Sequence, residues 1–258
     1  MQPLIIPLKP VLVFVIVLAR MGGLVTFAPF WGHKSVSVQI RIVLAFALAF
    51  ALTPLLLNRI APPSSDLLTL TPVLIGELLI GCAFGFVGRL VFSGLELAAQ
   101  VIGFQMGFSL ASTIDPSTQA QTAALGVVAQ MLGLVIFMGA DGHHWLLMAT
   151  MRSFEVAGPG AAHMTPALPQ LLIRLSADAL TVGVALAAPS IVMLLAVELA
   201  LAIAGRAIPQ IQVMILGFPL KIAAGLWLIG ASIYFMPGAI RAALAAMQSG
   251  LHRVLVSL

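Results

Sequence analysis

The fold class is decided by stretches such as residues 11–30, which read VLVFVIVLARMGGLVTFAPF. The only charge in this run is that of Arg20. A helix of about 20 predominantly apolar residues is long enough to cross a hydrocarbon core about 30 Å thick. We therefore predict a membrane-spanning helix over residues 11–30.

Six further apolar segments follow, separated by polar or proline-containing stretches, of which residues 141–178 form the only extended one. They cover residues 42–57, 70–88, 97–114, 122–140, 179–197 and 208–234. We expect the last segment to form two helical pieces, because Pro209 and Pro219 interrupt it and proline breaks or kinks a helix. A polar break is expected at residues 89–96, and one amphipathic helix near residues 145–154. The sequence thus predicts a single all-α, membrane-associated domain over residues 1–258, with six to seven apolar helical segments including broken helices.

Composition excludes a soluble globular domain. The 12 Lys and Arg and 8 Asp and Glu residues make up 8% of the chain, and hydrophobic residues make up 61%. Soluble domains carry about 25% charged residues. The net charge of +4 does not indicate nucleic-acid binding, because the basic residues stand singly rather than in clusters. We interpret them as charges that flank membrane spans.

Motifs of known enzymes are incomplete in this sequence. None of the three lysines follows a glycine, so a Walker A loop is missing, and residues 107–111 lack the second glycine of a nucleophile elbow. His143 and His144 would project about 100° apart on a helix, and we interpret them as interfacial residues beside Trp145. We therefore expect no enzymatic activity, no cofactor and no metal ion.

Ionisable residues inside or at the ends of apolar segments are more informative. Each would cost about 3 kcal/mol or more if it faced lipid unpaired, so we expect it to face a counter-charge, a protein partner or water. Arg89 and Glu96 are seven residues apart and could form a local ion pair. A proton relay is the alternative, and structural pairing is favoured. The residues concerned are Arg20, Glu77, Arg89, Glu96, Glu198, Arg206 and Lys221.

The segment 97–114 is weak for a lipid-facing helix, because it is rich in glycine and hydroxyl residues. Such a composition suits backbone that is packed in protein or lines a cavity. Its Phe104, Met106 and Phe108 are either core residues or a deformable apolar constriction. The glycine pairs Gly81 with Gly85, and Gly103 with Gly107, are each four residues apart, which permits close helix approach.

One run of sequence closely resembles the FliR family of flagellar biosynthetic proteins and its injectisome homologues. It covers residues 205–225 and reads GRAIPQIQVMILGFPLKIAAG. The resemblance spans nearly the whole chain. It is supported by Arg20 with residues 28–32, by Glu77 with the glycines that follow it, and by residues 103–116.

The resemblance implies a structural and gating subunit of the flagellar type III protein export channel, in the bacterial inner membrane at the flagellar basal body. It implies assembly with FliP and FliQ family subunits, a FlhB family export protein as a further partner, and unfolded secreted polypeptides as substrates. It also implies that much of the assembly lies above the membrane plane. The partners include lipid and exclude nucleic acid.

The resemblance further implies that residues 103–116 form a loop that plugs the closed channel, with Phe104, Met106 and Phe108 facing the pore. The plug residues are Gly103, Phe104, Gln105, Met106, Gly107, Phe108 and Ser109. The alternative is a secondary transporter of ions or small molecules, in which breaks near Pro209 and Pro219 create a site at the membrane midplane. A membrane enzyme has no motif in support.

Overall fold

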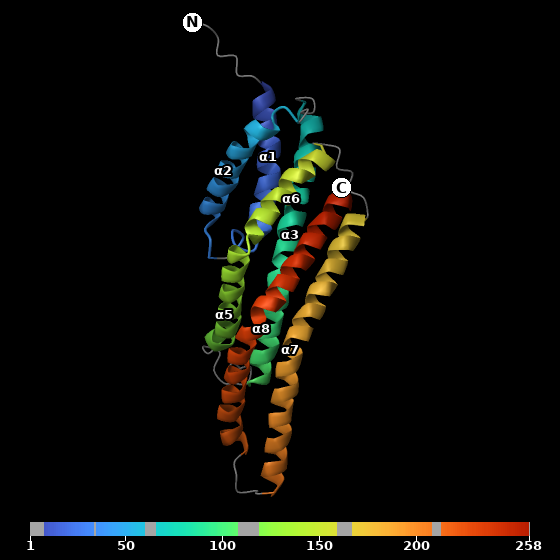
Figure 1. The fold of residues 1–258 in the computed structure, drawn as a ribbon. Helices are drawn as coiled ribbons and strands as arrows, with labels where there is room; N and C mark the ends of the chain where they lie inside the picture. The colour runs from blue at the N-terminus through green and yellow to red at the C-terminus, as the bar shows by residue number, and fades with distance from the viewer. Residues whose placement is uncertain are drawn as a thin grey trace. The chain divides into compact units, whose positions relative to one another are not determined.

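The structure is a computed structural model that describes residues 8–33, 35–59, 66–107, 119–158, 167–207 and 213–257. The described residues form helices and no strand, which confirms the predicted all-α fold (Figure 1). The helices are α1 (Leu8–Phe27), α2 (Val38–Leu56), α3 (Leu67–Gln105), α5 (Gln119–Gly139), α6 (Gly142–Val156), α7 (Ala167–Ala207) and α8 (Val213–Ser257).

Four of the described helices, α1, α2, α3 and α7, are long and apolar enough to cross a membrane. The number rises to five if Gln130–Gly139 and Gly142–Val156 form one broken span. Helices α3, α7 and α8 contain 39, 41 and 45 residues. At a rise of 1.5 Å per residue they are about 58, 62 and 68 Å long. Each is therefore about twice as long as the hydrocarbon core is thick.

The polar break predicted at residues 89–96 is wrong, because α3 continues through it as one helix. Gly94 lies in this stretch, and a Cβ atom there would lie 2.9 Å from the carbonyl oxygen of Ala179 in α7. Gly183 faces it in turn, with a Cβ position 2.7 Å from the Gly94 oxygen. The small residues of this stretch therefore mark a close crossing of two helices rather than a loop.

The break predicted within residues 208–234 is also wrong at Pro219, because α8 continues through it. Pro209 lies outside the described residues. Helix α7 likewise continues through Pro189 and extends well beyond the predicted span 179–197. A proline removes one backbone hydrogen bond, and in a packed apolar helix the surroundings can compensate for it. The predicted amphipathic helix near residues 145–154 is confirmed as α6.

The chain divides into two compact units. Unit 1 contains Met1–Leu90, Asp141–Ser176 and Ala245–Leu258, and unit 2 contains Val91–Ala140 and Ala177–Leu244. Each has its own buried apolar residues: Ile16, Leu24, Phe84, Leu146, Leu251 and others in unit 1, and Phe92, Phe137, Ala187, Leu194 and others in unit 2. The single domain that the sequence predicts stays a prediction.

Within unit 1, α1 packs closely against α3 through glycine. A Cβ atom at Gly81 would collide with the carbonyl oxygen of Arg20, and one at Gly85 would lie 2.7 Å from the oxygen of Leu24. The predicted close approach at this glycine pair is thus confirmed. On its other side α1 meets α2, where the rings of Phe14 and Phe46 pack edge to face with centroids 5.0 Å apart.

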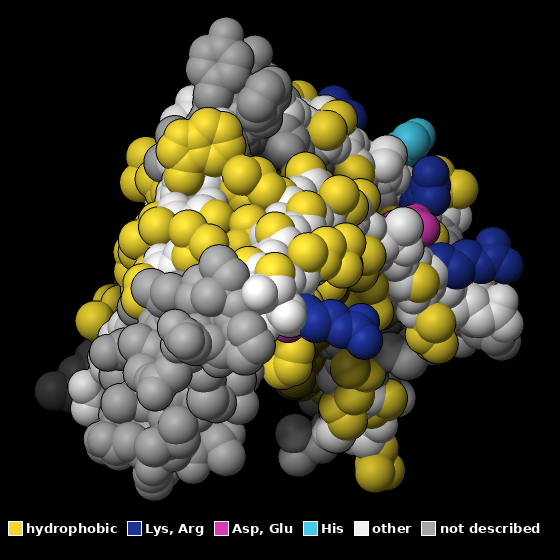
Figure 2. Space-filling model, turned by 90° about the horizontal axis from the view of Figure 1, so that it is seen from below, with side chains coloured by type: hydrophobic (Ala, Val, Ile, Leu, Met, Phe, Trp, Pro, Cys, Tyr) yellow, Lys and Arg dark blue, Asp and Glu magenta, His cyan; other side chains and the backbone are white. Residues whose placement is uncertain are grey.

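Much apolar surface is left uncovered by the chain itself. Only 11% of the apolar window of α2 is buried, compared with 44% for α1. Figure 2 shows one face of the molecule on which hydrophobic side chains are widespread and Lys and Arg interrupt them in a few places. Exposed large side chains on α2 and α7 include Val43, Phe50, Leu55, Val192, Leu199 and Ile203. This surface must be covered by lipid or by other protein chains.

Candidate functional site

A buried ion pair joins helices α1 and α3 of unit 1. The Arg20 guanidinium of α1 donates from Nε to the Oε2 atom of Glu77 in α3 at 2.6 Å, and its Nη2 lies 2.6 Å from the same oxygen. The two side chains are 0% and 1% exposed. A buried charge is costly unless it is paired and fully hydrogen bonded. The surroundings of Arg20 meet this requirement.

Helix α6 and its C-cap residue Ala157 supply the remaining partners of Arg20. Its Nη1 donates to the Ser153 hydroxyl at 2.6 Å, and its Nη2 donates to the carbonyl oxygen of Ala157 at 3.3 Å. The Phe154 ring lies 3.7 Å from the guanidinium carbon, a cation–π contact. Sequence reasoning expected a partner for Arg20 but missed these α6 residues, because no local pattern links positions more than 130 residues apart.

Lys221 and Glu198 form an ion pair between α8 and α7 within unit 2. Lys221 Nζ lies 3.1 Å from Glu198 Oε1, and the lysine side chain is only 20% exposed. Arg206 is exposed at the end of α7, Arg89 is exposed on α3, and Glu96 is half-buried on the same helix. In the described part of the chain, none of these three residues forms an ion pair.

The first residues of the predicted plug lie at the end of α3. Gly103 is buried, Phe104 is 66% exposed and Gln105 is half-buried. Met106 is fully buried, and Gly107 has a φ of 88°, a left-handed conformation that favours glycine. Phe108 and Ser109 lie outside the described residues.

Met106 packs against α8 within unit 2. A Cβ atom at Gly225 would lie 2.5 Å from both the Cγ and the Sδ atom of Met106. The backbone N–H groups of Met106 and Gly107 donate to Ile102 and Phe104, each at 3.0 Å. The helix end is thus fixed at Met106, whereas Phe104 points away from the buried side.

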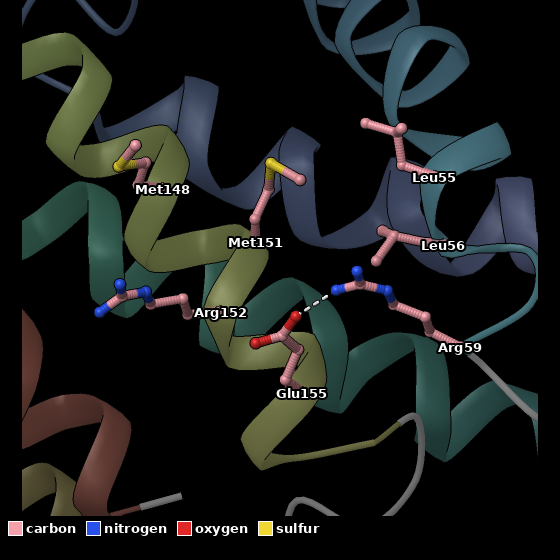
Figure 3. Close-up of a pocket in the computed structure, with 7 residues that line it drawn as sticks. All are labelled: Leu55, Leu56, Arg59, Met148, Met151, Arg152 and Glu155. Atoms are coloured by element: carbon pink, nitrogen blue, oxygen red, sulfur yellow. Dashed lines mark hydrogen bonds and ion pairs between the residues drawn. The ribbon is translucent and has the colours of Figure 1, made fainter.

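A cavity of about 340 Å³ lies between the end of α2 and α6 in unit 1. Figure 3 shows the Arg59 and Glu155 side chains meeting across it, where their ion pair joins the two helices. Both side chains are exposed. Sequence reasoning did not identify this cavity, because it arises where two distant segments meet. Its lining residues are Leu55, Leu56, Arg59, Met148, Met151, Arg152 and Glu155.

One group of described side chains has the composition and proximity of a metal site. The ligand atoms of Asp141, His143 and His144 all lie within 4.8 Å of one another at the start of α6. The two imidazole rings have centroids 4.8 Å apart. Helix periodicity alone separates adjacent residues by about 100°, but rotation of the side chains brings these two rings together.

Comparison with known proteins gives consistent matches along most of the chain. The profile of the family described as "Bacterial export proteins, family 1" matches residues 11–247. The chain is 33% identical over 223 residues to the flagellar biosynthetic protein FliR of Caulobacter vibrioides, covering 86% of this chain and 89% of that protein. It is 30% identical to FliR of Escherichia coli, covering 83% of this chain and 81% of the relative. For FliR of Bacillus subtilis the identity is 31%, over 81% of this chain and 82% of the relative.

Proposed function

The chain belongs to the FliR family of bacterial export proteins, and from this membership we propose that it is a structural and gating subunit of the flagellar type III protein export channel. Members of this family take part in flagellar biosynthesis and protein export. The apolar helices make the chain a multi-pass membrane protein. The finer proposal is that it lies in the inner membrane at the flagellar basal body. There it assembles with FliP and FliQ family subunits and a FlhB family protein.

The uncovered apolar surface of α2 and α7 is the observation that carries the assembly proposal. Only 11% and 22% of their apolar windows are buried by the chain itself. Exposed Arg206 adds a charge at the end of α7 that a carboxylate of a partner subunit can pair. The chain thus leaves an apolar face and a charge at a helix end uncovered. Such a chain fits a heteromeric assembly, in which unlike surfaces complement one another.

The end of α3 supports the gating proposal. Buried Met106 anchors the segment, Gly107 adopts a left-handed backbone conformation just after the helix end, and exposed Phe104 offers an apolar side chain to a pore. Bulky apolar side chains can seal a pore without hydrogen bonds that must later be broken. In this proposal an unfolded secreted polypeptide displaces the exposed aromatic side chains while Met106 holds the base of the plug. Phe108 and Ser109 would continue the seal.

Co-expression with the FliP and FliQ proteins of the same organism tests the proposal. The tagged chain is purified in detergent, and its mass is measured with and without these partners. We expect a defined hetero-oligomer with them and a poorly behaved chain without them. A monodisperse symmetric homo-oligomer formed by the chain alone would contradict the proposal. It would favour the secondary transporter instead, which is expected to be stable by itself.

A further inference from the structure

The start of α6 brings together a carboxylate and two imidazole rings. Asp141 Oδ1 lies 3.6 Å from His144 Nδ1, and the ligand atom of His143 lies within 4.8 Å of both. One carboxylate oxygen and two imidazole nitrogens are the donor set that divalent transition metals such as zinc prefer. Calcium and magnesium are disfavoured, because both take oxygen ligands almost exclusively.

Asp141 does not play the usual part of an aspartate at this position. It is the N-cap of α6, and an N-cap aspartate is normally extended and accepts a hydrogen bond from the first turn. Here the backbone is left-handed, with φ 56° and ψ 28°, and the side chain makes no capping hydrogen bond. Among the described residues it is the one non-glycine with positive φ. The strained backbone leaves the carboxylate free to face His144.

The backbone of Asp141 takes over the capping. Its carbonyl oxygen accepts from the N–H groups of His144 at 2.9 Å and Trp145 at 3.3 Å. The first turn of α6 is therefore hydrogen bonded although the Asp141 side chain does not cap it. A strained residue whose side chain is redirected toward a second polar group is a recognised sign of a functional site.

His143 supplies an independent observation. Its Nδ1 atom is shielded from solvent and has no hydrogen-bond partner among the described residues. Buried polar atoms are nearly always paired, so this shielded nitrogen needs an explanation. A metal ion held by the neighbouring ligands would account for a ring nitrogen that has no partner among the described residues.

We propose that Asp141, His143 and His144 bind a divalent transition metal ion, and that zinc fits best. Ligands about 2.0–2.1 Å from a tetrahedral zinc ion lie about 3.4 Å from one another, close to the 3.6 Å between Asp141 and His144. The ligand atom of His143 lies within 4.8 Å of the other two, so a rotation of its side chain is needed to complete a set of three protein ligands. A cation at the start of a helix is repelled by the positive end of the helix dipole, and the negative charge of Asp141 offsets this repulsion.

The site would fasten the first turn of α6, the helix that carries Ser153 and Phe154 of the Arg20 network. Zinc binding to the folded chain alone raises the temperature of unfolding by mass action. The inference does not depend on the gating proposal, because it concerns metal binding by the chain and not transport.

The test uses the full chain, purified in detergent through a tag that contains no histidine and stripped of metal by a chelator. Zinc is then titrated in competition with a chromophoric chelator. We expect one zinc ion per chain and a rise in the unfolding temperature. Affinity should fall at least tenfold in His144→Ala and in Asp141→Asn. Both residues are exposed, so these variants should fold normally.

His252→Ala is the matched control, because His252 is an exposed histidine of unit 1 outside the cluster. It should bind zinc as the unaltered chain does. Equal binding by all variants, an equal loss in His252→Ala, or no saturable binding by the unaltered chain would each overturn the proposal.

Discussion

Met106 occupies the space beside Gly225 that a side chain on α8 would otherwise fill. The contact lies within unit 2 and fixes the end of α3 immediately before Gly107, whose φ is 88°. If this contact holds the base of a plug, its fit determines how well the plug is seated.

Gly225→Ala is expected to unseat Met106. The added Cβ atom would lie 2.5 Å from two Met106 atoms, so the methionine must move. Overpacking of this kind typically costs about 1–3 kcal/mol. We expect higher permeability of the inner membrane to small solutes in cells that contain the assembled complex, measured by dye entry or ion leakage.

The control for this change is Gly230→Ala, because a Cβ atom at Gly230 on the same helix would meet nothing within 4 Å. It should leave permeability unchanged. Adding Met106→Ala to Gly225→Ala should remove the clash, although it also removes the buried methionine. If Gly230→Ala leaks as much as Gly225→Ala, the Met106 contact is not the cause.

Phe104→Ala tests the seal itself. Phe104 is 66% exposed, so its loss should scarcely alter the stability of the chain. We expect unchanged amounts of assembled complex together with increased membrane permeability. Phe104→Leu keeps an apolar side chain of similar bulk and should remain close to normal. A leak-free Phe104→Ala strain with normal assembly would return this residue to a packing or lipid-facing role.

Arg20→Ala should destabilise the chain strongly. The substitution leaves Glu77 buried without its counter-charge, and breaking a buried ion pair from one side costs about 3–5 kcal/mol. We expect a large loss of the chain from membranes and a lower unfolding temperature in detergent. Arg59→Ala is the comparison, because the ion pair with Glu155 is exposed and such pairs contribute about 0–1 kcal/mol.

The double variant Arg20→Met with Glu77→Leu separates charge from packing. Replacing both partners by apolar side chains of similar volume is often neutral. It should therefore be more stable than either single alanine variant. Stability as low as that of Arg20→Ala would mean that the hydrogen bonds to α6, and not the buried charges, dominate the energetics.

Arg206→Ala and Lys221→Ala should reduce assembly and motility for different reasons. Arg206 is exposed and unpaired within the described chain, so its loss should leave the unfolding temperature unchanged and weaken partner binding about tenfold or more. Lys221 already pairs with Glu198 inside unit 2, so its loss should also loosen the chain itself. Recovery of FliP and FliQ proteins with each tagged variant is the measurement. Normal recovery with both variants would indicate that neither cation contributes to partner binding.

Sequence reasoning identified the helices well and their ends poorly. Apolar runs of span length are visible without any partner, so the all-α fold follows from composition and periodicity. The reading of residues 89–96 as a break assumed that polar and small residues meet water, whereas Gly94 meets α7. Such a contact depends on a distant segment, which local hydropathy does not register.

The candidate site was predictable in the same uneven way. The cost of a buried charge predicts that Arg20 and Glu77 need partners, but not that Ser153 of α6 and Ala157 at its C-cap provide the remaining hydrogen bonds. The angle of about 100° between adjacent Cβ atoms on a helix predicts that His143 and His144 point apart. Rotation about the side-chain bonds, which that angle leaves out, decides whether His143 and His144 can meet.

The bare apolar face of α2 also imposes an order on biogenesis. Once made, this helix has most of its apolar surface outside the packed part of unit 1. Association with any other exposed apolar segment competes with correct burial from that moment. A newly synthesised chain must therefore reach lipid, or the partner subunits of the proposed assembly, before it meets misfolded neighbours. In the proposed assembly, the relative supply of those subunits therefore limits how many complete complexes form.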